Sequence, residues 1–226
     1  MLAHPFETDV IRTSAGDLTI TFLGHGSLMF ALGEKIIHID PFSRVADYAI
    51  LPKADLILIT HEHQDHLDIA ALKHIRTPNT AIVLTELCDQ QIEGGIVMRN
   101  GDISVVQGIS IEAVPAYNMI HTRESGDPFH PCGHGNGYIL TIGDTRVYVA
   151  GDSENTPEML ALRDIDIAFL PMNLPYTMTP EMVAEATRAM RPGILYPYHF
   201  GSTDTKQLID LLVDQPETEI RIREMA

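Results

Sequence analysis

The sequence has little cysteine, which excludes a fold stabilised mainly by disulfides. Its 226 residues contain two cysteines, Cys88 and Cys132, which are too few to form a disulfide framework. A reducing compartment is therefore the expected environment. Residues 1–7 show no basic region followed by an apolar stretch, and no apolar run is long enough to span a bilayer. We therefore expect a cytoplasmic protein without a membrane partner.

Basic residues are also few. Lys and Arg number 15 against 31 Asp and Glu, which gives a formal net charge of −16. Because phosphate backbones are bound mainly through Lys and Arg, a nucleic-acid partner is not expected. A small anionic substrate is compatible with the acidity, because a bound metal supplies local positive charge. The oligomeric state does not follow from composition.

Two common catalytic and binding motifs are missing. The chain has no Gly-x-Ser-x-Gly sequence, so it lacks the strand-to-helix turn that carries the nucleophile of serine hydrolases. The glycines of 133–137 precede an expected strand and do not join a strand to a helix. They therefore do not form the phosphate-binding turn of a dinucleotide site.

The apolar pattern predicts a mixed α and β chain of one domain over residues 1–226. There is no low-complexity linker and no repeat of clear short period. The first half is rich in strands, and the second half begins with a hairpin and then alternates strands with helices. This order favours two mixed sheets packed face to face with helices outside. Strands are expected at 18–23, 28–32, 35–39, 55–59, 80–84, 103–106, 109–114, 138–142, 146–150, 166–170, 194–196 and 219–222, and helices at 67–75, 86–91, 156–162, 180–190 and 204–213.

A histidine-rich segment follows the strand expected at 55–59. It reads His61-Glu62-His63-Gln64-Asp65-His66, and a helix is expected directly after it. Residues two apart in an extended segment can point the same way, so His61 and His63 can share one metal. Asp65 and His66 can face a second metal nearby. This spacing predicts metal binding, although one short segment cannot complete two coordination spheres.

Other residues suited to metal binding stand at the ends of later strands. Asp152 follows the strand that ends at Ala150, and His199 follows the strand that ends near Tyr196. Each is weak evidence alone, because Gly-Asp is a common turn and a lone histidine is often part of the core. They gain weight because functional loops gather at one edge of an open sheet.

The order of these motifs resembles the metallo-β-lactamase superfamily over nearly the whole chain. That resemblance implies a four-layer αββα sandwich with a two-metal site at one edge. It implies that His61, His63 and a middle histidine hold one metal. Asp65, His66 and His199 would hold the other, and Asp152 would bridge the two. The segments 23–27 and 40–42 also resemble a branch of single-domain hydrolases that includes ascorbate-phosphate lactonases.

The middle histidine has several candidates in the irregular segment 117–137. The stretch from Phe129 to Tyr138 resembles a His-Pro-x-Gly-x-Gly-x-Gly-Tyr pattern of that branch, which favours His130. His134 fits a His-x-x-Gly element of glyoxalase II-like members and is the alternative, and His121 also lies in this segment. Cys132 lacks a second thiol at metal-binding spacing, so we do not expect it to be a ligand.

Several further residues have both a functional and a structural interpretation. His25 stands at a glycine-rich turn and can face substrate or bond to the backbone. Asp40 can orient a ligand histidine or simply start a turn before Pro41. Asn173 lies in a segment, 172–178, that can line a pocket or merely pack. His4, His38 and His74 have no motif support.

The chemical hypothesis is metal-assisted hydrolysis of a small ester, lactone or phosphoester. Two divalent cations, expected to be zinc with manganese or iron as alternatives, would activate a bridging hydroxide that Asp65 helps to orient. A phosphodiesterase or nuclease of the same fold is one alternative. A non-hydrolytic redox module is the other, but di-iron relatives commonly carry His-x-Glu-x-Asp, and His63 replaces that carboxylate here.

Overall fold

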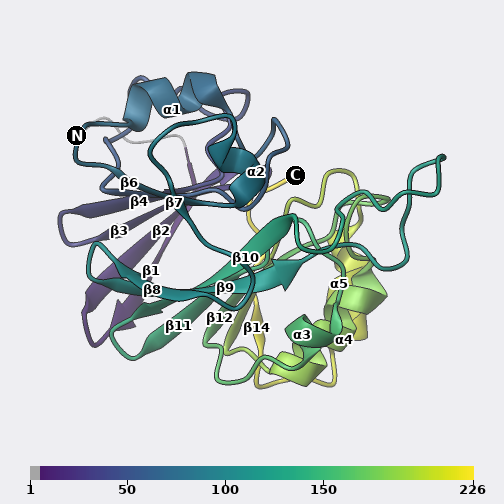
Figure 1. The fold of residues 1–226 in the computed structure, drawn as a ribbon. Helices are drawn as coiled ribbons and strands as arrows, with labels where there is room; N and C mark the ends of the chain where they lie inside the picture. Colours follow the sequence, from purple (N-terminus) through teal and green to yellow (C-terminus); the bar gives the residue numbers. More distant parts are fainter. Residues whose placement is uncertain (1–5) are drawn as a thin grey trace.

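The computed structural model describes residues 6–226, so His4 and most of the amino-terminal segment considered above lie outside the described part. Two seven-stranded sheets pack face to face, and within each sheet neighbouring strands are also neighbours in sequence (Figure 1). The first sheet contains β1 (Thr8–Thr13), β2 (Gly16–Gly24), β3 (Ser27–Leu32), β4 (Lys35–Ile39), β5 (Leu56–Leu58), β6 (Ala81–Leu84) and β7 (Ile96–Val97). The second contains β8 (Ile103–Val106), β9 (Ile109–Ala116), β10 (Gly135–Ile142), β11 (Thr145–Val149), β12 (Ile167–Pro171), β13 (Ile194–Tyr198) and β14 (Glu219–Ile220).

The two sheets repeat one pairing pattern. In the first, β1 to β4 pair antiparallel and β4 to β7 pair parallel. In the second, β8 to β11 pair antiparallel and β11 to β14 pair parallel. Parallel strands end at the same edge of a sheet, so the segments that follow them gather there.

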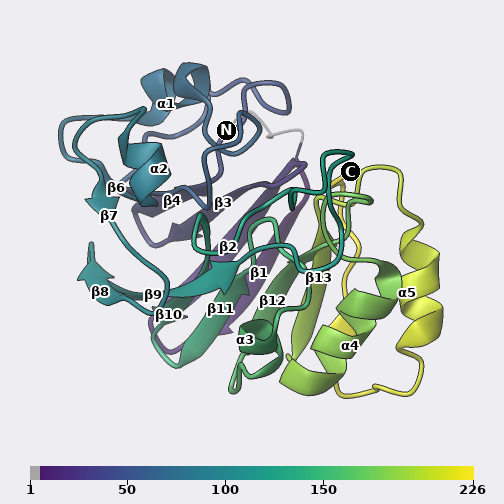
Figure 2. The ribbon, with the colours of Figure 1, turned by 45° about the vertical axis from the view of Figure 1, so that its right-hand side comes forward.

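Three apolar layers hold the molecule together. The central one lies between the sheets, where the rings of Phe22, Phe169 and Tyr196 contact one another at 4.9–6.4 Å between centroids. The outer layers lie between each sheet and its helices. Helices α1 (Ile69–Ile75) and α2 (Glu86–Asp89) cover the first sheet, and α3 (Pro157–Leu160), α4 (Pro180–Met190) and α5 (Thr205–Leu211) cover the second (Figure 2). This is the αββα sandwich that the sequence predicted.

Local sequence fixes the ends of the helices. The side chain of Thr179 accepts a hydrogen bond from the amide of Met182, and Pro180 takes the first position of α4, as predicted. The helix ends at Met190, and the next residue, Arg191, has a left-handed backbone and precedes a proline. Asp68 caps α1 by accepting from two backbone amides, and it also accepts from Ser43.

Two strands were not predicted from the sequence. Strand β1 forms a hairpin with β2, and its side chains alternate between exposed and half-buried positions. Its polar composition gives a weak strand signal, and its pairing with β2 is what makes it a strand. Strand β7 has only two residues. In addition, β10 begins at Gly135 and not at Tyr138, so it includes the end of the segment expected to be irregular. Among residues 6–226, no helix is long and apolar enough to cross a membrane.

Candidate metal centre

The histidine segment, Asp152 and His199 meet at one edge of the sandwich. His61 to His66 follow β5, Asp152 follows β11, and His199 directly follows β13. His25 comes from the turn after β2, and His130 from the long connection between β9 and β10. Elements from both sheets and both halves of the chain therefore build one site.

The side chains that can bind metal form overlapping groups. In each group one nitrogen or oxygen atom per residue lies within 4.8 Å of the others. The groups are His61, His63 and His130; His61, His66 and Asp152; and His25, Asp65 and His199. His134 belongs to none of them.

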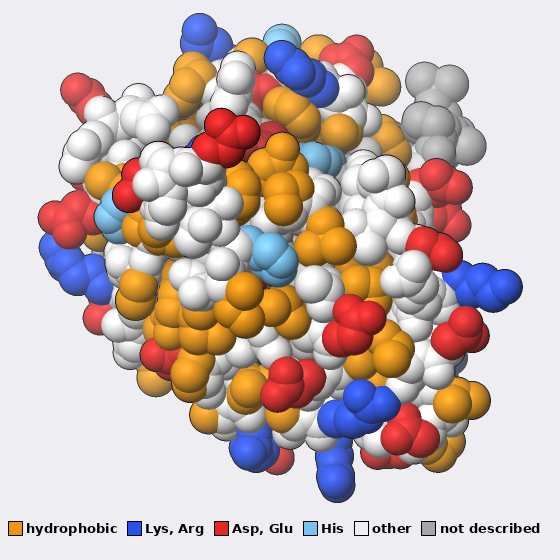
Figure 3. Space-filling model, turned by 90° about the vertical axis from the view of Figure 1, so that its right-hand side faces the viewer, with side chains coloured by type: hydrophobic (Ala, Val, Ile, Leu, Met, Phe, Trp, Pro, Cys, Tyr) orange, Lys and Arg blue, Asp and Glu red, His pale blue; other side chains and the backbone are white. Residues whose placement is uncertain are grey.

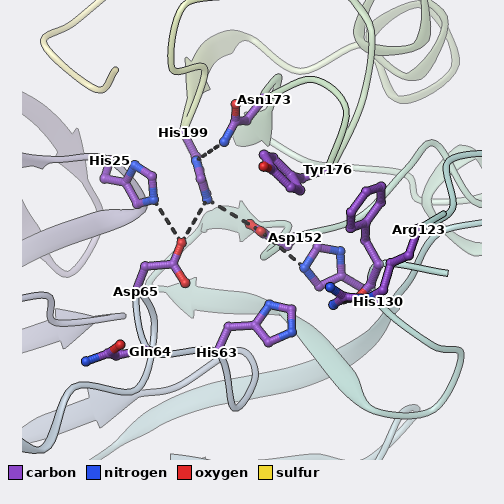
Figure 4. Close-up of a pocket in the computed structure, with 11 residues that line it drawn as sticks. His25, His63, Gln64, Asp65, Arg123, His130, Asp152, Asn173, Tyr176 and His199 are labelled. Carbon is purple, nitrogen blue, oxygen red and sulfur yellow. Dashed lines mark hydrogen bonds and ion pairs between the residues drawn. The ribbon is translucent and has the colours of Figure 1, made fainter. Parts of the chain in front are cut away.

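Asp152 lies at the centre of the cluster and is buried. Its Oδ2 is 3.3 Å from Nε2 of His130 and 3.4 Å from Nε2 of His199. Its Oδ1 is 3.4 Å from Nε2 of His66. One carboxylate thus contacts histidines from three separate segments of the chain. Figure 4 shows its interactions with His130 and His199.

Asp65 occupies the more open side of the cluster. Its Oδ2 lies 3.0 Å from Nε2 of His25 and 3.8 Å from Nε2 of both His66 and His199. The rings of His25 and His199 are 3.7 Å apart between centroids, and both residues have left-handed backbones, with φ of 54° and 45°. Strained backbone of this kind is often retained at functional sites. His25 therefore faces the site, which was one of its two sequence interpretations.

Asp40 fixes the orientation of the histidines after β5. Its Oδ2 accepts from Nδ1 of His66 at 2.8 Å and from the hydroxyl of Thr60 at 2.6 Å, and its Oδ1 accepts from the amide of Thr60. The Thr60 hydroxyl in turn lies 3.0 Å from Nδ1 of His61. Because Nδ1 of each histidine faces this network, Nε2 of each faces the cluster. The hydrogen bond expected between Asp40 and a histidine is present.

A second network holds His130. The side-chain oxygen of Asn118 accepts from the amide and from Nδ1 of His130, at 3.0 and 2.7 Å. Asn118 donates to Oε1 of Glu154, whose carboxylate also accepts the backbone amides of residues 119, 120 and 121. Sequence analysis missed Asn118 and Glu154, because nothing in their local pattern shows that they meet.

Several atoms of the cluster are buried without a hydrogen-bond partner among the described residues. They are Nε2 of His61, Nε2 of His66, Nε2 of His199 and Oδ1 of Asp152. Burying polar atoms without partners is costly, and the protein normally pairs them. Imidazole nitrogen and carboxylate oxygen are the ligands that zinc and similar divalent cations bind. The donor set therefore fits a metal centre.

Electrostatics keeps the acid at the centre ionised. Burial opposes the charge of Asp152, but His199 and His66 outweigh this effect and hold its pKa well below the ordinary value. Burial, reinforced by the neighbouring His66, lowers the pKa of His61 well below its ordinary value. At His66 burial opposes the charge, but Asp152 and Asp40 outweigh burial and raise its pKa well above the ordinary value. A metal that binds His66 must therefore displace a proton.

The remaining sequence candidates lie around this cluster. The side-chain amide of Asn173 is 3.4 Å from Nδ1 of His199 and lines the adjoining pocket. His134 lines a small recess together with His61 and His130. Cys132 is exposed and free, and it belongs to none of the candidate groups.

The cluster opens into a cavity of about 530 Å³. Besides the clustered residues, the cavity is lined by Gln64, Arg123, Phe129, Asn173 and Tyr176. Histidine side chains are visible near the middle of this face, beside hydrophobic surface, whereas most Lys and Arg side chains lie toward its periphery (Figure 3). The site is therefore open to a small molecule.

Comparison with known proteins finds relatives that are named as metal-dependent hydrolases. A "UPF0173 metal-dependent hydrolase" of Thermococcus onnurineus is 30% identical, over 89% of this chain and 95% of its own length. A solved structure from Parabacteroides distasonis, assigned as a metal-dependent hydrolase, is 48% identical with a TM-score of 0.93, covering 98% of this chain and 100% of that one.

More distant structures share the fold alone. CmlA, a diiron beta-hydroxylase from Streptomyces venezuelae, is 16% identical with a TM-score of 0.70, over 90% of this chain and 52% of its own.

The family model described as "Beta-lactamase superfamily domain" matches residues 19–199, which include all the clustered histidines and both aspartates. The strand order, the edge on which the ligand-type residues meet and this match agree, and the chain belongs to the metallo-β-lactamase superfamily.

Proposed function

We propose that this protein is a hydrolase that uses two divalent cations, most readily zinc, to cleave a small ester, lactone or phosphoester. The relatives named as metal-dependent hydrolases support the general activity. The observation that supports the two-metal form is the central position of Asp152, whose oxygens lie 3.3–3.4 Å from Nε2 of His130, His66 and His199. A carboxylate placed in this way can bridge two cations.

The proposed ligand sets are those that the resemblance to the superfamily implies. His61, His63 and His130 form a compact group on one side of Asp152. Oδ2 of Asp65 lies 3.8 Å from Nε2 of both His66 and His199, and these three residues form the second proposed set. His130 is preferred to His134 as the middle ligand, because only His130 is grouped with other ligand-type residues.

The two cations would supply Lewis acidity and lower the pKa of a bound water toward neutrality. The protein's own residues orient and neutralise the site. Asp40 and Asn118 hold ligand histidines by Nδ1. The carboxylate of Asp65, 3.0 Å from Nε2 of His25, can accept a hydrogen bond from a bound water and so orient it. No serine or cysteine nucleophile is required.

A redox module of the same fold is the alternative from another class. The diiron relative shows that the fold by itself does not decide the chemistry. His63 lies beside His61 and His130, with ring centroids 4.6 and 4.9 Å away, where carboxylate would favour iron. The nitrogen-rich ligand set therefore supports zinc-type hydrolysis.

Metal content and activity of purified variants test the proposal together. His130→Ala should reduce bound zinc from two equivalents toward one, whereas His134→Ala should keep both. Zinc-loaded wild type should hydrolyse at least one substrate among a lactone, an aryl ester, a thioester and bis(4-nitrophenyl) phosphate. Stoichiometric iron with visible absorption in the purified protein, or full zinc occupancy without any hydrolysis, would overturn it.

A further inference from the structure

The pocket beside the metal centre has one basic side chain and an aromatic wall. We propose that the substrate carries an oxyanionic group, a carboxylate or a phosphate, beside a flat apolar part. Arg123 would bind the anion, and the ring pair Phe129 and Tyr176 would contact the apolar part. This inference rests on the proposed hydrolase function and names its substrate class.

A tight hairpin fixes the backbone around Arg123. Thr122 and Pro128 form an isolated β-bridge at its base. The amide of Arg123 donates to the carbonyl of Asp127 at 2.8 Å, and the amide of Gly126 donates back to the carbonyl of Arg123 at 2.9 Å. Arg123 is therefore presented by an ordered turn, although its side chain is exposed.

The guanidinium group is positioned but only partly engaged. It donates one hydrogen bond to the carbonyl of Phe129 at 3.1 Å and lies over the ring of the same residue, 5.2 Å from its centroid. An arginine carries five N–H donors, and no further hydrogen bond or ion pair joins this side chain to residues 6–226. The remaining donors can bind a carboxylate or phosphate in the bidentate geometry that arginine favours.

Charge explains why this one arginine matters. The chain carries a formal charge of −16, which disfavours the approach of an anion. Among residues 6–226, Arg123 is the only Lys or Arg that lines the pocket, and the acidic groups there, Asp65 and Asp152, face histidines. An anionic substrate thus meets a local positive charge next to the cluster, on the side of the pocket opposite His25 (Figure 4).

The aromatic wall joins two separate loops. The rings of Phe129 and Tyr176 meet edge to face, with centroids 5.0 Å apart. Asn118 donates to the carbonyl of Tyr176 at 2.9 Å, so the network that holds His130 also holds this ring's backbone. Tyr176 is 45% exposed, and the apolar side chains of Met119, Ile120 and Leu174 are also exposed on the same two loops. Such a surface can bury a flat apolar group.

Two esters of matched length provide the kinetic test. The 4-nitrophenyl monoester of succinic acid is anionic, and 4-nitrophenyl butyrate is a neutral ester with the same leaving group. Arg123→Gln in the zinc-loaded protein should raise KM for the succinate ester about tenfold to hundredfold and change butyrate hydrolysis less than twofold. Arg123→Lys should recover part of the loss. Arg12→Gln, an exposed change on β1, is the matched control and should leave both esters unaffected.

A binding measurement separates this inference from the proposed function. Calorimetric titration with benzoate and with phenylphosphonate reports the preferred anion without turnover, in metal-free and zinc-loaded protein. Arg123→Gln should weaken at least one of these ligands about tenfold or more in both forms. If Arg123→Gln weakens binding but no ester is hydrolysed, the hydrolase proposal fails and the anion site stands. If hydrolysis is present but both esters and both ligands are insensitive to Arg123→Gln, the anion site is refuted.

Discussion

Replacing Glu154 by glutamine should loosen the loop that carries His130. The Glu154 side chain is fully buried, and its Oε2 accepts the amides of Met119 and Ile120, each at 2.7 Å. Its Oε1 accepts from the amide and ring of His121, both at 2.7 Å, and from Asn118 at 3.1 Å. Burial opposes its ionisation, but these hydrogen bonds outweigh burial and lower its pKa.

The magnitude follows from the two bonds at Oε2. In the glutamine variant one side-chain position becomes an NH₂ group, which donates and cannot accept. If it takes the place of Oε2, two backbone donors lose their acceptor, and each such bond to a charged group contributes about 1.5–3 kcal/mol. Structural relaxation and hydrogen bonds to water offset part of this free energy, so we expect the loop to lose about 3 kcal/mol of local stability. That corresponds to amide exchange about a hundredfold faster at 119 and 120.

Native-state hydrogen exchange and metal titration together measure the effect. Faster exchange should be confined to the loop, and zinc affinity should fall about tenfold to hundredfold because Asn118 no longer holds His130 rigidly. Glu158→Gln is the matched control, since among residues 6–226 the Glu158 side chain accepts only an exposed hydrogen bond, from Tyr117 of the same loop. Unchanged exchange at residues 119–121 in Glu154→Gln would refute the reasoning.

Three further changes test other parts of the structure. Asp40→Asn should lower zinc affinity about tenfold to hundredfold with the fold intact, because an amide cannot accept all the hydrogen bonds that orient the histidines. Asp55→Asn, directly before β5, is the control and should leave zinc affinity unchanged. Gly151→Ala should reduce the free energy of unfolding, measured by chemical denaturation, by about 2–4 kcal/mol, because φ is +64° and the new Cβ would lie 2.9 Å from Thr60 Cβ. A variant as stable as wild type would contradict this. Asp9→Asn should reduce the free energy of unfolding at pH 7 by about 1–3 kcal/mol. Burial opposes ionisation of Asp9, but hydrogen bonds from Tyr196 and Arg223 lower its pKa below 3.8, so its contribution is present above that pH and is lost as pH falls through the folded-state pKa. Denaturation curves at several pH values should show the variant and wild type converging below pH 3.8, and a constant difference would contradict this explanation.

The sequence predicted the architecture well because its signals are local. Apolar runs bounded by Gly, Pro and Asp marked most of the strands, and Thr179 with Pro180 marked the start of α4. Strand β1 was not predicted because its composition is polar. Its conformation comes from pairing with β2 and from contacts such as that of Asp9 with Tyr196. Long-range pairing of this kind has no counterpart in local pattern.

For the site, the sequence by itself determined the ligand-rich segment His61–His66 and the strand-end positions of Asp152 and His199. Residue type and spacing carry that information, because metal binding demands particular donor atoms. Only the tertiary structure decided which histidine of the irregular segment joins the cluster, since that segment has no periodicity to fix its path. There His130 is grouped with His61 and His63, and His134 is not. The hydrogen bonds of Asn118 and Glu154, and the anion-binding role proposed for Arg123, likewise depend on distant loops that meet at one edge of the two sheets.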